Sequence, residues 1–178
     1  MHKLQNKACF LDRDGVINRA IVKEGKPYPP QALGDFELLP DVTEALRALR
    51  KAGYLLIVVT NQPDVARGTQ KKEVVEAMHQ RLLQELPLDD IEVCYDEASD
   101  RYKPFPGMIL DSAKKHQIDL ASSYMVGDRW RDIGAGKAAG CSTIFIDYKY
   151  NEKSTETPNF ICFSLKEAAK TILSKESC

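Results

Sequence analysis

The stretch Phe10–Asn18 reads FLDRDGVIN, in which an apolar run ends abruptly in two aspartates, Asp12 and Asp14. A short apolar run of this kind is typical of a buried strand in a parallel sheet. The chain contains several such runs, rich in β-branched and aromatic residues: ACFL (8–11), YLLIVV (54–59), IEVCY (91–95), YMVG (124–127) and STIFI (142–146). We therefore expect a parallel sheet whose first strand ends at Asp12.

Segments with helical periodicity lie between most of these runs. The segment 41–52 opens with Asp41 and Glu44 in capping-box spacing and stops before Gly53. Further helices are expected over 70–86, with the apolar stripe Val74, Val75, Met78, Leu82 and Leu83, over 106–116 and 132–140, and after Ser164. Strands that alternate with helices predict an α/β fold, a doubly wound parallel sheet with right-handed crossovers. The polar segment 148–160 is expected to be a mobile loop.

Composition narrows the setting. A chain of 178 residues with 43% hydrophobic content fits one domain, residues 1–178. Its 25 basic and 26 acidic residues leave a net charge of -1, which offers no general attraction to nucleic acid or an anionic membrane. The segment MHKLQNKACF (1–10) lacks the uninterrupted apolar core typical of a signal peptide, and no apolar run approaches the roughly 20 residues that span a bilayer. We therefore expect a cytoplasmic protein, a monomer or weak homo-oligomer, with reduced cysteines.

Polar residues follow the expected strands at their carboxyl ends, where ligands bind in sheets of this kind. These residues are Asp12, Thr60, Asn61, Asp96 and, after Gly127, Asp128. Each of them alone could cap a helix or form a turn. Several acids at one sheet edge repel each other unless a cation neutralises them, and hard oxygen ligands suit Mg²⁺. The pattern thus predicts a magnesium site.

Four segments in chain order, DRDGVIN, TNQ, KPFPGM and GDRWRD, resemble the four motifs of the haloacid dehalogenase superfamily of phosphatases. The extended forms FLDRDGVIN, VVTNQPDVARG and SYMVGDRWRDIGAGKAAG are similar to the branch that contains heptose bisphosphate and histidinol-phosphate phosphatases. The resemblance covers about residues 8–146 and implies a Rossmann-like domain. The intervals between the motifs are filled by the expected helices and strands, so we expect a minimal cap and an open site, with specificity in the short loops 19–30 and 62–69.

The resemblance implies a role for each motif residue. Asp12 would be the nucleophile that forms an aspartyl-phosphate, and Asp14 the general acid and base. Thr60 and Lys103 would bind phosphoryl oxygens. Asp128 would hold Mg²⁺ together with Asp12 and the backbone carbonyl of Asp14. Asp132 would act behind these ligands, orienting lysine or metal-bound water. The expected substrate-binding residues are Asn61, Gln62, Arg67, Tyr102 and Arg129.

One segment departs from the resemblance. Members of this branch usually carry a Cys/His zinc loop that ends in Cys-x-Cys-Arg-Lys-Pro, whereas this chain reads CYDEASDRYKPFPGM. Cys94 is the one thiol left there, so no zinc is expected. Tyr102 stands where the substrate-recognising arginine would precede the lysine, and offers an aromatic surface suited to stacking on a ring. Arg101, Arg129 or Arg67 could compensate for that arginine.

The leading prediction is a Mg²⁺-dependent phosphomonoesterase that acts on a small phosphorylated sugar, above all the 7-phosphate of D-glycero-D-manno-heptose 1,7-bisphosphate. The alternatives are a phosphatase of histidinol phosphate or another small metabolite, a nucleic-acid 3′-phosphatase, and a catalytically silent sugar-phosphate-binding protein. The absence of a basic stripe disfavours nucleic acid. His79 and His116 are expected to be surface residues, and Trp130 to pack beside the site.

Overall fold

The computed structural model describes residues 6–176. Six parallel strands form one sheet in the order β5-β4-β1-β6-β7-β8. They are β1 (Lys7–Leu11), β4 (Tyr54–Asn61), β5 (Asp90–Cys94), β6 (Tyr124–Gly127), β7 (Ser142–Ile146) and β8 (Phe160–Cys162). Each of the first five coincides with an expected run to within a few residues, and the doubly wound α/β prediction is confirmed. The edge strand β8 was not expected.

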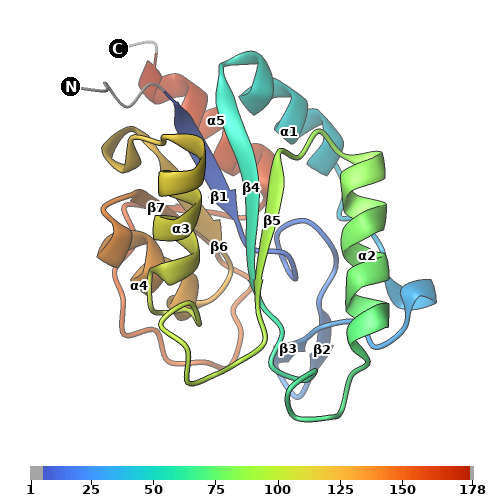
Figure 1. The fold of residues 1–178 in the computed structure, drawn as a ribbon. Helices are drawn as coiled ribbons and strands as arrows, with labels where there is room; N and C mark the ends of the chain where they lie inside the picture. Colours follow the sequence, from blue (N-terminus) through green and yellow to red (C-terminus); the bar gives the residue numbers. More distant parts are fainter. Residues whose placement is uncertain (1–5, 177–178) are drawn as a thin grey trace.

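Helices cover both faces of the sheet, as Figure 1 shows. On one face, α3 (Gly107–His116) and α4 (Trp130–Ala139) bury apolar residues such as Met108 and Ile133. On the other, α1 (Val42–Lys51) packs on α5 (Leu165–Glu176), and α2 (Lys72–Glu85) adds Met78 and Leu82 to the same core. The strands between the two layers read as continuous apolar runs because both of their faces are buried.

The start of α1 differs from the expected capping box. Asp41 adopts a left-handed conformation, with φ of 62°, and its side chain caps no backbone N–H. A cap residue normally has extended backbone angles, so the left-handed backbone of Asp41 departs from the geometry of a capping box. The expected stop at Gly53 is confirmed, because this residue has φ of 87° and comes directly after Ala52, the C-cap residue of the helix.

The carboxyl ends of the strands face a small hairpin, β2 (Ile21–Lys23) and β3 (Lys26–Tyr28), which Figure 1 shows at the lower end of the sheet. Its turn residues Glu24 and Gly25 both have positive φ, as a two-residue hairpin turn requires. The hairpin and a short 3-10 helix, Leu33–Asp35, are the elements that stand between β1 and α1. The expected minimal cap is thus this hairpin. None of the helices in residues 6–176 has the length and apolarity needed to cross a membrane.

Candidate active site

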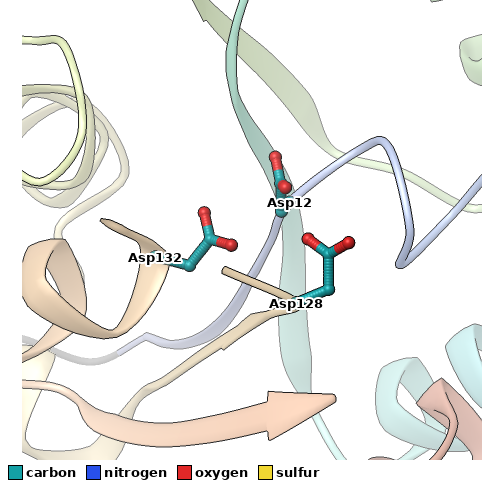
Figure 2. Close-up of side chains that lie close together, drawn as sticks. All are labelled: Asp12, Asp128 and Asp132. Carbon is teal, nitrogen blue, oxygen red and sulfur yellow. The ribbon is translucent and has the colours of Figure 1, made fainter. Parts of the chain in front are cut away.

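Parallel pairing brings the first and fourth motifs together. Strand β6 lies beside β1, and the Asp12 N–H donates to the carbonyl of Val126 at 3.0 Å, so Asp12 and Asp128 leave adjacent strands side by side. Asp132 joins them from the first turn of α4. Figure 2 shows the three carboxylates close together, and one oxygen from each lies within 4.8 Å of the others. Asp96, the other strand-end acid, is exposed and does not line the cavity around them.

Lys103 is the cation that binds this cluster. Its buried Nζ donates to Asp12 Oδ1 at 2.8 Å, to Asp132 Oδ1 at 2.6 Å and to the carbonyl of Val59 at 2.8 Å. Asn61 holds the lysine backbone from both sides, because its side-chain amide accepts from the Lys103 N–H and donates to the Lys103 carbonyl. Burial opposes the ammonium charge, but the two aspartates outweigh it and raise the Lys103 pKa. All three donor positions of the ammonium are thus used.

Asp132 links the lysine to the helix that carries it. Its Oδ2 accepts the backbone N–H of Arg129 at 3.0 Å, which caps the start of α4, while Oδ1 binds Lys103. The close approach requires Gly127, since a Cβ there would lie 2.1 Å from that of Asp132. The expected contact of Asp132 with the lysine is therefore present in the structure.

Asp128 is the member of the cluster with a buried oxygen that has no hydrogen-bond partner among the described residues. This oxygen is Oδ1, whereas Oδ2 accepts the Tyr150 hydroxyl at 2.9 Å. Burial and the charges of Asp12 and Asp132 raise the Asp128 pKa well above its usual value. Gly15, with φ of 86°, leaves room for this carboxylate, because a Cβ would lie 1.9 Å from Oδ2. Buried carboxylate oxygens, one of them unpartnered, fit a hard divalent cation such as Mg²⁺.

Asp12 and Asp14 lie in opposite electrostatic surroundings. Burial and the charge of Asp132 raise the Asp12 pKa to about 6, against the opposing effect of Lys103. Burial also acts to raise the Asp14 pKa, but the Arg13 guanidinium and hydrogen bonds from Asn18 and Gln62 outweigh it, so that pKa is lowered. Asp12 thus binds a proton at a higher pH than Asp14 does, and near pH 7 both carboxyl groups are mostly ionised.

Arg13 is the residue that makes this difference. Its side chain is completely buried, and its Nη2 donates to both carboxylate oxygens of Asp14, at 3.0 and 3.2 Å. Its Nη1 donates to Nε2 of His79 on α2, at 3.1 Å. Burial and the charge of Arg13 lower the His79 pKa to about 4, so the imidazole is a neutral acceptor near pH 7.

A cavity of about 330 Å³ opens above these groups. The expected residues Asp12, Asp14, Lys103, Asp128 and Asp132 line its floor. The expected residues Asn61, Arg67, Tyr102 and Arg129 also line it, together with the hairpin segment 26–29 and Arg131. Two expected residues lie beneath this lining: the buried Gln62 amide donates to Asp14 Oδ2 at 2.9 Å and to Thr60 Oγ1 at 3.0 Å.

Sequence reasoning misplaced His79. His79 is 7% exposed and bonded to Arg13, so the expectation of a surface residue is wrong for it, whereas His116 is partly exposed, with Nε2 2.7 Å from Asp90 Oδ2. The signal for His79 was present, because it stands between Met78 and Leu82 on the inward stripe of α2. Leu83, which had been assigned to that stripe, is 41% exposed.

Two further residues of the site were missed. Tyr150 comes from the segment 148–160 and bonds Asp128, so part of this expected loop packs against the cluster. Arg131, in the first turn of α4, donates to the Tyr102 hydroxyl at 3.2 Å. Neither residue lies on a periodic apolar pattern, and their contacts span 22 and 29 residues of sequence. The expected packing position of Trp130 holds in that the Arg131 guanidinium lies over its ring, 5.4 Å from the centroid.

Comparison with known proteins agrees with this geometry. A family model described as haloacid dehalogenase-like hydrolase matches residues 27–140. A D-glycero-beta-D-manno-heptose-1,7-bisphosphate 7-phosphatase of Rhodopseudomonas palustris is 39% identical over 151 residues, which cover 75% of this chain and 79% of the relative. A protein of the same name from Photorhabdus laumondii is 33% identical over 183 residues, covering 93% and 94%.

The fold also has a solved counterpart. The D,D-heptose 1,7-bisphosphate phosphatase of B. bronchiseptica, crystallised with magnesium and phosphate, superposes with a TM-score of 0.76. It is 27% identical, and the match covers 95% of this chain and 99% of that one.

Proposed function

Because the chain belongs to the haloacid dehalogenase-like hydrolase family, we propose that it is a single-domain, Mg²⁺-dependent phosphomonoesterase that removes the 7-phosphate of D-glycero-D-manno-heptose 1,7-bisphosphate. The names of the relatives from R. palustris and P. laumondii support the substrate. The observation that carries the proposal is the arrangement of Lys103, which bridges Asp12 and Asp132 beside the unpartnered oxygen of Asp128.

Asp12 is the proposed nucleophile. Its carboxylate lies on the cavity floor, where one oxygen binds Lys103 and the other is available to attack phosphorus in line. Attack forms an aspartyl-phosphate and releases the sugar alkoxide. Lys103 holds the attacking group in place and offsets the charge that gathers on the phosphoryl oxygens.

Asp14 is the proposed general acid and base. It protonates the departing sugar oxygen and then takes a proton from the water that hydrolyses the aspartyl-phosphate. The acid step needs a proton on a carboxyl group whose pKa the protein lowers. The dianionic phosphoryl group of a bound substrate acts in the opposite direction, because a nearby negative charge raises a carboxyl pKa. Asp14 therefore takes up its proton as the substrate binds.

Asp12, Asp128 and the backbone carbonyl of Asp14 are the proposed Mg²⁺ ligands. When bound, the cation would lower the Asp12 pKa and screen the repulsion between this carboxylate and an anionic substrate. Tyr150 holds Asp128 by one oxygen and leaves the other for this use. Asp132 is committed to Lys103 and the Arg129 N–H, and so keeps the lysine and the helix in register.

The proposal is tested by phosphate release from a panel of phosphate esters at fixed Mg²⁺. The panel contains D-glycero-D-manno-heptose 1,7-bisphosphate, histidinol phosphate and an oligonucleotide with a 3′-phosphate. We expect the highest kcat/KM for the heptose bisphosphate, with one equivalent of phosphate released and the 1-phosphate retained. A higher kcat/KM for histidinol phosphate would reassign the substrate. Binding of the sugar phosphate without any release would indicate a silent binding protein.

A further inference from the structure

Three arginines line the cavity outside the acidic floor, and we call the part that they form its rim: Arg67, Arg129 and Arg131. They differ in the groups to which they are bonded. Arg67 pairs with Glu97 and Asp64, and Arg129 pairs with Glu152. Both charges are thus already offset by carboxylates. Arg131 lines the same cavity but has no carboxylate partner within 4.0 Å in residues 6–176. Its positive charge is therefore available to a ligand.

Aromatic rings hold the Arg131 guanidinium in place. The group lies 5.7 Å from the centroid of Tyr102 and 5.4 Å from that of Trp130, and its Nη1 donates to the Tyr102 hydroxyl. Contact with ring faces keeps water off a guanidinium while preserving its charge. Preorganisation of this kind lowers the entropy lost when an anion binds.

The hydrogen bonds of the Arg131 guanidinium also indicate that it is available to a ligand. Its Nε is buried and has no hydrogen-bond acceptor among the described residues. The Tyr102 hydroxyl is the one hydrogen-bond acceptor of this guanidinium among the described residues, so its other N–H groups have no protein acceptor to give up when an anion binds. Arginine is well suited to this task because its fork of N–H groups can bind two oxygens of a phosphate at once.

The position of Arg131 fits the far end of a small substrate. Arg131 precedes Asp132, which bonds Lys103 on the floor, so floor and rim meet within the first turn of α4. The start of a helix also favours negative charge. A cavity of about 330 Å³ is at the small end of the range for metabolite sites and fits a molecule the size of a sugar phosphate.

We propose that Arg131, held against Tyr102, binds a second phosphate at the end of the substrate remote from the one that Asp12 attacks. This inference rests on the proposed function and names the residue that makes the site selective for a bisphosphate. It replaces the expectation that Arg101, Arg129 or Arg67 takes this role. Arg101 pairs with Glu92 and Asp111 and does not line the cavity.

The first test compares kcat/KM for heptose 1,7-bisphosphate and heptose 7-phosphate in the wild type and in Arg131→Gln. We expect the preference of the wild type for the bisphosphate to fall by about 10- to 100-fold, mainly through KM, which is the loss expected for one or two charge-assisted hydrogen bonds. Arg131→Lys, which keeps the charge but not the fork, should retain part of the preference. Arg101→Gln is the matched control and should keep the wild-type preference.

The second test measures binding without turnover. Both sugars are titrated calorimetrically into Asp12→Asn and into the double variant Asp12→Asn/Arg131→Gln, with Mg²⁺ present. We expect tighter binding of the bisphosphate by the single variant and a reduced difference in the double variant. An unchanged preference in Arg131→Gln in both tests, or an equal fall in Arg101→Gln, would overturn the inference. A wild type that hydrolyses neither sugar overturns the proposed function alone, because the titrations still decide the role of Arg131.

Discussion

The floor and the rim of the cavity are held together by ion pairs that differ in burial. On the floor, Lys103 joins the buried carboxylates of Asp12 and Asp132, which come from different elements of the fold. On the rim, Arg67 and Arg129 form pairs that remain partly exposed to water. Removing one partner of a buried pair costs about 3–5 kcal/mol, whereas an exposed pair contributes about 0–1 kcal/mol. We therefore expect the exchange of a rim residue to cost little stability, and the loss of Lys103 from the floor to cost much more.

The largest effect is expected from Asp12→Asn, which removes the nucleophile from the floor and keeps its shape. We expect phosphate release to fall by more than about a thousand-fold, because no neighbouring group can form the acyl-phosphate in its place. Far-UV circular dichroism should stay native. Asp96→Asn makes the same chemical change at the same sheet edge outside the cavity, and should keep wild-type activity. Appreciable release by pure Asp12→Asn would contradict the covalent mechanism.

Asp14→Asn should be damaging in a different way. It retains the nucleophile but loses the proton donor, so a poor leaving group suffers most. We expect a loss of about 100-fold or more on the sugar phosphate and a smaller loss on an aryl phosphate with a low-pKa leaving group. The measurement is kcat/KM across aryl phosphates of graded leaving-group pKa. Equal losses throughout the series would mean that Asp14 acts in folding or in metal placement.

Lys103→Gln tests the stability side of the comparison. It leaves two buried aspartates without their cation, so we expect the free energy of unfolding to fall by about 3–5 kcal/mol. Lys115→Gln removes an exposed lysine that pairs with Asp90, and should cost about 0–1 kcal/mol. Urea denaturation of both variants checks the contrast. Similar losses in the two proteins would show that the buried cluster on the floor is no more costly to break than an exposed pair.

The floor could be predicted from the sequence because each of its groups follows an apolar run. Asp12 and Asp128 end strands that must pair in parallel, and that rule brings them to one edge. The rim follows no such rule, since the contact between Arg131 and Tyr102 depends on where α4 meets a loop. Tyr150 could not be identified as a site residue for the same reason, because its polar segment has no periodicity that would place it beside Asp128.

Short exposed strands could not be predicted from the periodicity of the sequence either. The three-residue strands β2, β3 and β8 bury little surface, and Val22 and Ile161 on them are more than half exposed. Without burial on one face, the alternation that identifies a strand is weak. The turn at Glu24 and Gly25 was the one available signal for the β2–β3 hairpin.

The buried His79 makes the stability of the fold depend on pH. Its folded pKa of about 4 lies below its ordinary value of 6.5, so the unfolded chain binds the proton first as the pH falls. This contribution to stability is fully present above about pH 6.5 and is lost towards pH 4, by about 3 kcal/mol in total. His79→Gln keeps an acceptor for Arg13 and does not titrate. As the pH falls from about 6.5 to about 4, we expect the wild type to lose this amount of unfolding free energy relative to the variant. A constant difference in urea denaturation across that range would contradict the buried neutral histidine.

The smallest effect on stability is expected from removal of the metal. This experiment asks whether the metal is held by the floor of the cavity or by the loop after β5. Among residues 6–176, the acidic cluster of Asp12, Asp128 and Asp132 is the one group of three or more potential ligands that lie together, and the Cys94 thiol is engaged with the carbonyl of Asp96. A weakly held Mg²⁺ stabilises a fold only through its binding equilibrium, whereas structural zinc contributes to folding directly. We therefore expect a chelator to stop phosphate release, added Mg²⁺ alone to restore it, and the melting temperature to move by no more than a few degrees. Cys94→Ala should leave the metal content unchanged. About one tightly bound zinc per chain by elemental analysis, with a large fall in melting temperature on its removal, would show that the loop after β5 holds a structural metal.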